Sequence, residues 1–274
     1  MTQTIRIDYK EYPECMFAVI AAFLPQDEGH DIRRVAGHVA FRSTDRHGNT
    51  FRNGLLHSYD DQPAVQGQKY KAWYRNGVFH RDGDRPAVIE GKSKWWYRDG
   101  KHHRDGNLPA IIKKGQNKQW YINGLKHRDG DLPAFVSEER QEWYQYGVCH
   151  RDGDNPAVIQ GDYLHEWYKQ GERHRDGDMP AMIFGETQSW WRRGELHRDG
   201  DMPAVVEGYW YKTWYKNGKI HRDGDRPAVI ERLRRVWYKK GMRHREGDLP
   251  AVVESNGNKQ WFLDGQCIRV YKSE

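Results

Sequence analysis

The sequence predicts an all-β protein: an elongated repeat array of stacked β-hairpins, about nine units of 23 or 24 residues, with a small N-terminal cap. Three observations predict this fold class. A histidine recurs every 23 or 24 residues, Asn-Gly and Asp-Gly turn signals recur between the histidines, and helical periodicity is absent from the array. The 12 Trp, 16 Tyr and 8 Phe are too many for a disordered chain, and the 28 Gly and 11 Pro favour turns over long helices.

The repeat is defined by H-R-[DE]-G-[DN]-x-P-A, which occurs eight times, each time with a tryptophan seven residues before its histidine. A first, degenerate copy begins at His57 and reads H-S-Y-D-D-Q-P-A. We expect these tryptophans and histidines to be structural: Trp73, Trp96, Trp120, Trp143, Trp167, Trp190, Trp214 and Trp237, with His80, His103, His127, His150, His174, His197, His221 and His244. The spacing from tryptophan to the following proline is constant, whereas the return from proline to tryptophan takes mostly 10 and 11 residues in alternation, which suggests a structural unit of two repeats.

Each repeat has the elements of a β-hairpin, in a fixed order. The segment Trp73–Gly77 reads W-Y-R-N-G, and Asn-Gly favours a type I′ turn because both central residues of that turn have positive φ. Asp82-Gly83 then marks a second tight turn, and Pro-Ala-Val-Ile-Glu follows as a short strand with proline at its start. We therefore expect two or three short strands in each repeat.

The two ends of the chain depart from the repeat. Residues 1–36 do not fit it and are predicted to form the N-terminal cap, in which the apolar run Met16–Leu24 is a short helix or a buried strand. Residues 37–274 form the predicted array, and its last half-unit has Ile268 where the other units have histidine.

The sequence contains neither a membrane-spanning segment nor a cysteine pattern typical of disulfide-bonded proteins. No apolar run approaches the ~20 residues that span a bilayer. The three cysteines, Cys15, Cys149 and Cys267, are far apart and odd in number, which argues against a disulfide framework. We therefore expect a cytoplasmic location.

The H-R-D-G-D loop that recurs along the sequence has a structural interpretation and two alternatives. We expect the histidine to pack against tryptophan, the arginine to pair with an aspartate of its own or a neighbouring loop, and the aspartates to bond to local backbone N–H groups. Loops that bind a ligand, or an H-x-D-x-D metal site, are the alternatives. H-R-D also opens the catalytic loop of protein kinases, but a ladder of seven copies without the other kinase motifs excludes that enzyme class.

The net charge of +6 raises the question of nucleic acid. The eight H-R-[DE]-G-[DN] segments together carry −7, so the rest of the chain carries +13, and this positive charge follows the Trp-Tyr strands. The candidate binding residues are the cations Arg75, Arg98, Lys169, Arg192, Lys216, Arg234, Arg235, Lys239 and Lys240, and the tyrosines Tyr74, Tyr121, Tyr168, Tyr215 and Tyr238. Cations interleaved with aromatic rings suit single-stranded nucleic acid, and they equally suit a solvated β-face protected from aggregation.

The repeat W-Y-x-N-G-x-x-H-R-D-G-D-x-P-A resembles the MORN-like repeats over residues 37–274, in a variant of the kind found in phage and large-virus proteins. It departs from the standard unit, which is richer in glycine and opens on Tyr-x-Gly. The resemblance implies a non-enzymatic scaffold that binds proteins or membrane lipids, of viral type and then located in the host cytoplasm. It carries over no catalytic residue.

Together these observations predict a protein that is not an enzyme and uses no cofactor or metal. We expect a repeat scaffold that binds a protein partner through its extended sheet face. Nucleic-acid or nucleotide binding through the basic aromatic face is the alternative. The alternating turn length also fits a periodic partner or a homo-oligomer.

Overall fold

The computed structural model describes residues 42–114 and 116–273. The predicted cap at residues 1–36, including Met16–Leu24, lies outside the described residues. Every regular element of the described chain is a β-strand, as predicted. Contacts divide the chain into two compact units: the first includes residues 42–114 and 121–124, and the second includes 116–120 and 125–273.

The first unit begins with a small antiparallel sheet, β1 (Arg42–Thr44), β2 (Thr50–Arg52) and β3 (Leu55–Leu56). The strands that follow pair antiparallel in chain order, each with the strand before it and the strand after it. They are β4 (Val65–Gln66), β5 (Tyr70–Ala72), β8 (Val88–Glu90), β9 (Ser93–Trp95) and β12 (Ile111–Ile112).

The second unit continues the same pattern over more strands, which confirms the predicted array of successive hairpins. Its sheet strands are β13 (Lys118–Gln119), β16 (Phe135–Val136), β17 (Arg140–Glu142), β20 (Val158–Gln160), β21 (Leu164–Glu166), β24 (Met182–Phe184), β25 (Thr187–Ser189), β28 (Val205–Glu207), β29 (Tyr211–Thr213), β32 (Val229–Ile230), β33 (Arg234–Val236), β36 (Val252–Glu254), β37 (Lys259–Leu263) and β38 (Gln266–Tyr271).

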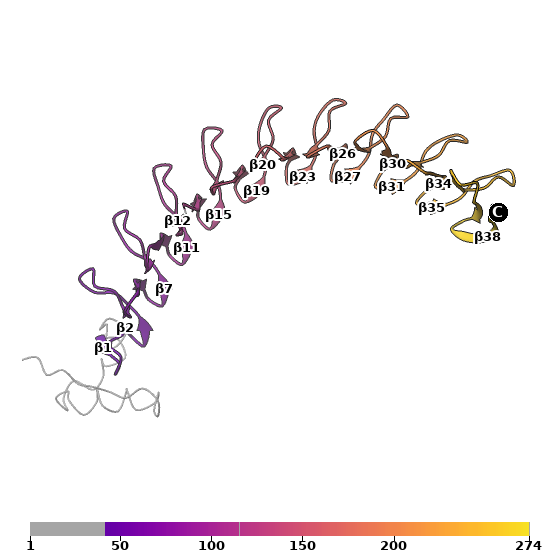
Figure 1. Cartoon of the computed structure of the whole chain (residues 1–274). Coiled ribbons are helices and arrows are strands. Elements are labelled where there is room, and N and C mark those ends of the chain that lie inside the picture. The colour runs from indigo at the N-terminus through magenta and orange to yellow at the C-terminus, as the bar shows by residue number, and fades with distance from the viewer. Residues whose placement is uncertain (1–41, 115, 274) are drawn as a thin grey trace, which may run out of the picture. The chain divides into compact units, whose positions relative to one another are not determined.

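A second type of hairpin, of two residues per strand, recurs once in each repeat (Figure 1). The first of these strands follows the tryptophan, and the second precedes the histidine. They are β6 (Tyr74–Arg75), β7 (Val78–Phe79), β10 (Tyr97–Arg98), β11 (Lys101–His102), β14 (Tyr121–Ile122), β15 (Leu125–Lys126), β18 (Tyr144–Gln145), β19 (Val148–Cys149), β22 (Tyr168–Lys169), β23 (Glu172–Arg173), β26 (Trp191–Arg192), β27 (Glu195–Leu196), β30 (Tyr215–Lys216), β31 (Lys219–Ile220), β34 (Tyr238–Lys239) and β35 (Met242–Arg243).

The backbone angles explain the turn residues. In the hairpin β6–β7 both Asn76 and Gly77 have positive φ, 48° and 83°, which confirms the predicted turn. In the H-R-D-G-D loop of the same repeat the positive values fall on Gly83 and Asp84, one residue later than the Asp-Gly pair itself. The turn of this loop is therefore centred on Gly-Asp.

The core is thin and built from the residues that the repeat keeps constant. The alanine of Pro-Ala is fully buried in each complete repeat, for example Ala181 and Ala204, and the tryptophans that precede the loops are all buried. Because Trp73 and Tyr74 are adjacent in an extended segment, their side chains point to opposite faces. On the tyrosine side the rings of Tyr74, Phe79 and Tyr97 follow one another with centroids 4.5 and 5.0 Å apart.

Candidate binding surface

The loop arginine connects neighbouring repeats. The guanidinium of Arg198 lies 3.7 Å from the ring centroid of Trp190, and its Nε and Nη2 donate hydrogen bonds of 2.6 and 2.8 Å to Asp178 in the preceding loop. Its Nη1 donates to the carbonyl oxygen of Pro203 at 3.3 Å. The same bidentate pair forms at Arg81–Asp61, Arg104–Asp84, Arg151–Asp131, Arg175–Asp154, Arg222–Asp201 and Arg245–Asp225.

The loop histidine also bonds in two directions. Nε2 of His197 lies 2.9 Å from Asp199 of its own loop, and Nδ1 accepts the backbone N–H of Asn217 in the turn of the next repeat at 3.1 Å. Both bonds recur at His80, His103, His127, His150 and His174, and at His221. The group that lies over each tryptophan ring is thus the arginine guanidinium, while the histidine joins an aspartate to the following turn.

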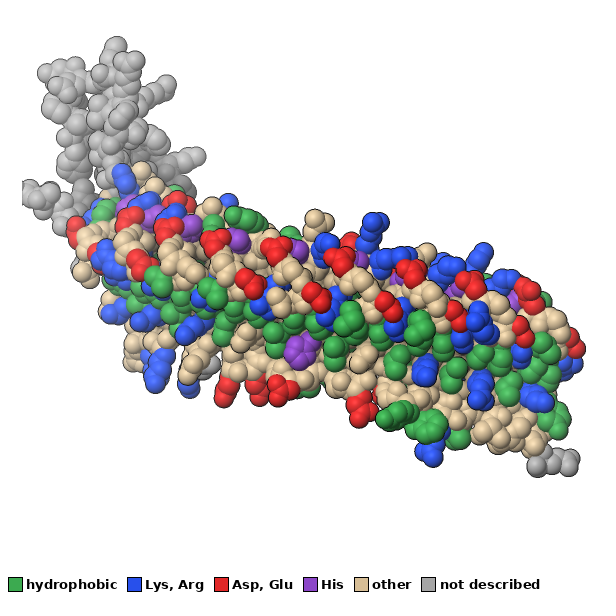
Figure 2. Space-filling model, turned by 90° about the horizontal axis from the view of Figure 1, so that it is seen from above, with side chains coloured by type: hydrophobic (Ala, Val, Ile, Leu, Met, Phe, Trp, Pro, Cys, Tyr) green, Lys and Arg blue, Asp and Glu red, His purple; other side chains and the backbone are tan. Residues whose placement is uncertain are grey.

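Six of the predicted binding cations are each bonded to an acidic residue at the equivalent position of their own repeat. They lie two residues after the tryptophan, and each forms an ion pair with the acidic residue two positions after the histidine of its own repeat. The pairs are Arg75–Asp82, Arg98–Asp105, Lys169–Asp176, Arg192–Asp199, Lys216–Asp223 and Lys239–Glu246. Figure 2 shows acidic and basic side chains alternating along these loops. These acids are therefore paired with cations of the adjacent hairpin strands.

The predicted binding tyrosines are half-buried within the small hairpins. Tyr74 stacks with Phe79 of the paired strand, and burial raises the pKa of Tyr74 to about 12. The Tyr168 hydroxyl bonds to Arg173 at 3.2 Å, and the Tyr238 hydroxyl accepts from Arg243 at 3.2 Å. Tyr121 and Tyr215 occupy the same position in their repeats and are also half-buried. These rings pack on their neighbours and present little open surface.

The three other predicted cations differ among themselves. Arg234 forms an ion pair with Glu231 at 2.9 Å. Lys240 occupies a turn position with φ of 50°, and its backbone N–H donates to Nδ1 of His221. Arg235 is exposed on β33, opposite Ile230 on one side and Val253 on the other.

Arg235 belongs to a row of side chains that we call the open face. Residues directly opposite in antiparallel strands share one face, so the register fixes its members. In the first unit they are Gln66, Lys71, Ile89, Lys94 and Ile112. In the second unit they are Lys118, Val136, Gln141, Ile159, His165, Ile183, Gln188, Val206, Lys212, Ile230, Arg235, Val253 and Lys259.

From Lys71 to Lys259, the open face alternates a polar residue with a β-branched aliphatic one. Its cations form no ion pair with any residue in 42–114 or 116–273, unlike the cations beside the loops; they are Lys71, Lys94, Lys118, Lys212, Arg235 and Lys259. Its row contains no acidic residue. Apart from Arg235, sequence reasoning missed this set, although a signal was available: every polar member except Gln66 lies two residues before a tryptophan of the repeat.

Exposed apolar residues occupy two turns between strands of the second unit. In the turn between β28 and β29, Tyr209 and Trp210 are 90% and 63% exposed, and Leu233 in the turn after β32 is 63% exposed. The guanidinium of Arg232 lies 5.8 Å from the Trp210 ring centroid. Trp210 precedes Lys212 of the open face by two residues, and Leu233 precedes Arg235 by two.

The thiol of Cys149 and the helix content of the described chain bear on two other classes of function. Cys149 is half-buried next to His150, and burial raises the pKa of its thiol to about 12, which leaves it a poor nucleophile at neutral pH. No helix among residues 42–114 and 116–273 is long and apolar enough to cross a membrane.

Comparison with known proteins leaves the family open. No protein-family model matches the chain, and no curated protein matches it.

Proposed function

We propose that the protein is a non-enzymatic repeat scaffold that binds a protein partner through its extended sheet face. One observation carries this proposal: the open face offers the same pair of side chains, one aliphatic and one polar, in successive repeats. The constant residues of the loops bond to each other instead. A face that repeats its chemistry at fixed spacing favours a partner that is itself extended or periodic.

The charge of the open face indicates the chemistry of this partner. Unpaired lysines and arginines alternate with isoleucine and valine, so a complementary surface carries carboxylates beside apolar groups. The absence of acids from the row means that nothing within it competes for such a partner.

Site-specific photo-crosslinking tests the proposal. A photoreactive amino acid is placed at Gln141 or Gln188 on the open face and, as a matched control, at Asn155 in a loop. We expect a nuclease-resistant protein adduct from the open-face positions that is lost when Lys212, Arg235 and Lys259 are changed to glutamate. Equal adducts from the loop position, or adducts that survive the charge reversal, contradict the proposal.

Nucleic-acid binding is the second candidate, and one observation favours it. Lys212, Arg235 and Lys259 are consecutive unpaired cations of the open face, and Trp210, two residues before Lys212, has an exposed ring. A groove or face that combines cations with aromatic stacking surface is typical of single-strand binding.

Two adjacent arginines provide a matched test of this candidate. Arg235 is unpaired on the open face, whereas Arg234 is bonded to Glu231. If single-stranded DNA binds here, Arg235→Ala lowers the slope of log affinity against log salt by about 1, and Arg234→Ala leaves it unchanged. Binding that is absent at low salt, or equally sensitive to both changes, excludes this candidate.

A further inference from the structure

Most complete repeats contain a group of three charged or polar side chains, and the first repeat lacks one of the three. In the second, Asp82 bonds to Nε2 of His80 at 3.1 Å and also pairs with Arg75. The carboxylate thus lies between an imidazole and a guanidinium, and the same arrangement recurs along the array.

In the first repeat the histidine and the arginine are present without the acid. His57 corresponds to His80, Arg52 corresponds to Arg75, and the position of Asp82 is occupied by Tyr59. Within the described chain Arg52 forms no ion pair. Its register partner across β1 and β2 is Arg42, so no carboxylate lies opposite it either.

The Nδ1 of His57 is occupied by Asn76. It lies 3.2 Å from the backbone N–H of Asn76, which can only donate, and 3.0 Å from the side-chain Oδ1, where the roles depend on the tautomer. Burial lowers the pKa of His57, which keeps the ring neutral at pH 7; when Nδ1 accepts the backbone N–H, the ring proton is on Nε2. No residue in 42–114 or 116–273 accepts a hydrogen bond from that Nε2.

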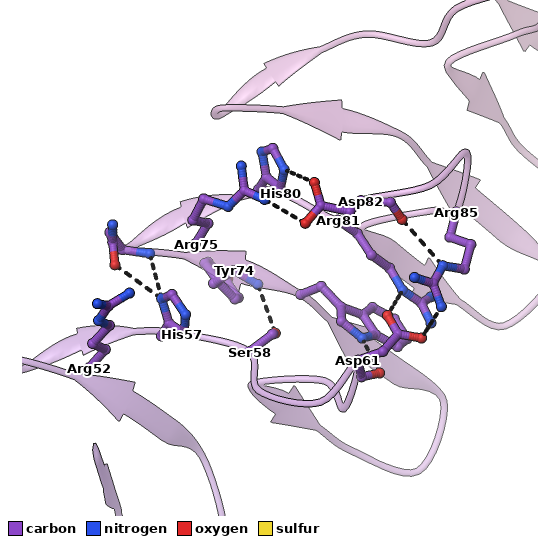
Figure 3. A pocket seen from close by; sticks show the side chains of 12 residues that line it. Arg52, His57, Ser58, Asp61, Tyr74, Arg75, His80, Arg81, Asp82 and Arg85 are labelled. Atoms are coloured by element: carbon purple, nitrogen blue, oxygen red, sulfur yellow. Dashed lines mark hydrogen bonds and ion pairs between the residues drawn. The ribbon is translucent and has the colours of Figure 1, made fainter. Parts of the chain in front are cut away.

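A pocket of about 360 Å³ opens at this place (Figure 3). Arg52, His57 and Ser58 line it on one side, and Arg75 and Arg81 line it on the other. Ser58 stands where the complete repeats have arginine, and its short side chain, which accepts the backbone N–H groups of residues 64 and 74, leaves the space open.

The charges of the pocket lining are unbalanced. Four arginines, at positions 52, 75, 81 and 85, face two aspartates, at positions 61 and 82, which gives a net charge of +2. Tyr59 does not enter the pocket, because its hydroxyl donates to the carbonyl oxygen of Phe51 and the Arg42 guanidinium covers its ring. A small anion therefore meets cations and a directed N–H donor.

We propose that this pocket binds an external carboxylate, held by Arg52 and His57 in the place that Asp82 takes beside Arg75 and His80. The carboxylate is the favoured anion because the chain itself places one at this position in the following repeat. The acidic group comes from a small organic acid or from an acidic side chain of a partner. The pocket is separate from the open face, so either proposal can fail alone.

Histidine NMR on the full chain tests the proposal, with an internal control. Protein labelled on its imidazoles is titrated with acetate at constant ionic strength, and His57→Gln assigns the signal. We expect a saturable shift at His57 and none at His80, whose Nε2 is already bonded to Asp82. No saturable shift at His57, or equal shifts at both rings, overturns the proposal.

Two variants in the pocket and one control outside it test whether acetate binds at the position of the missing carboxylate. Arg52→Gln removes a charge-assisted hydrogen bond, so acetate binding weakens about tenfold or more. Tyr59→Asp supplies the carboxylate from the chain, so the response to acetate disappears even in a fully folded protein. Lys69→Gln, an equal loss of charge outside the pocket, leaves the response unchanged. Binding that persists in both pocket variants contradicts the assignment.

Further probes identify the source of the anion. A capped peptide with one internal aspartate that binds more tightly than acetate indicates a partner side chain, and equal affinities indicate a small organic acid. Inorganic phosphate that binds while acetate does not overturns the carboxylate assignment.

Discussion

The guanidinium of Arg81 lies 3.6 Å from the ring centroid of Trp73, and the same guanidinium holds the carboxylate of Asp61 from the preceding loop with two bonds of 2.8 Å. The Arg81 side chain thus packs on the buried tryptophan of its own repeat and forms an ion pair with an aspartate of the preceding repeat. Because a cation over a tryptophan face and a bidentate carboxylate pair are both favourable, the contact couples adjacent repeats at the edge of a thin core.

Removing one of these arginines tests the coupling. Arg198→Ala loses the stack on Trp190 and leaves Asp178 unpaired, and we expect a loss of about 2 kcal/mol in the free energy of unfolding. Arg192→Ala, which breaks a mostly exposed pair with Asp199, should cost less than about 0.5 kcal/mol. Urea unfolding followed by tryptophan fluorescence measures both. Equal losses for the two variants contradict the role given to the stacked arginine.

Acid should destabilise the array through the same pairs. The hydrogen bond from Arg198 lowers the pKa of the Asp178 carboxyl below its usual 3.8, and the equivalent aspartates are lowered in the same way by their arginines. A carboxyl whose folded pKa is depressed stabilises the fold above its unfolded pKa, and this contribution is lost as the pH falls through the folded value.

We therefore expect the melting temperature to be flat from pH 7 to about 5 and to fall below about pH 4. Thermal melts followed by circular dichroism across this range measure it. Asp178→Asn should make the acid slope shallower, because one fewer carboxylate takes up a proton. A melting temperature that stays constant into strong acid shows that the pairs contribute nothing.

The burial of the alanine in Pro-Ala predicts that a larger side chain at this position destabilises the protein. Ala204 has no exposed surface, so Ala204→Leu must displace packed neighbours and should cost about 1–3 kcal/mol. Glu207→Leu, at an exposed position of β28, the strand that follows Ala204, is the control and should change stability little. Chemical denaturation compares them. Tolerance of leucine at position 204 would mean that the core has space that the structure does not show.

Some hairpin turns carry strain that asparagine relieves. Lys240 has φ of 50° at the position where other repeats have asparagine, and Lys240 keeps its N–H bonded to His221. Because asparagine tolerates the left-handed region better than lysine, Lys240→Asn should stabilise the protein by about 0.5–1 kcal/mol. Asn217→Lys, the reverse exchange at an equivalent turn, should destabilise it by a similar amount. The two melting temperatures moving in the same direction would refute this explanation.

The fold was predictable because the turn residues of each repeat can be recognised in the sequence. Asn-Gly at positions 76 and 77 fixes a hairpin by local backbone geometry, and proline at position 86 marks a strand start in the same way. The pairing of the loop arginine with an aspartate was also predictable as chemistry, but the choice of the preceding loop required the stacking of repeats in space.

The candidate surface was harder to predict because charge in a sequence does not show which charges are paired. Arg75 and Asp82 are seven residues apart, and only the hairpin between them brings the guanidinium to the carboxylate. Lys94 and Arg98 look alike in the sequence, yet Lys94 lies on the open face and Arg98 is bonded to Asp105. Strand register decides which of the two side chains is paired. It depends on the two strands that flank each strand in the sheet, and the sequence of one repeat does not show them.

The arginine–aspartate links have a direction. Each loop supplies its second aspartate to the arginine that follows and its own arginine to the aspartate that precedes, as Asp178 and Arg175 do in the second unit. The same link therefore joins each of these loops to the next. Addition or loss of whole repeats by gene duplication and deletion preserves this link, and a change of two repeats at a time also preserves the alternating turn length.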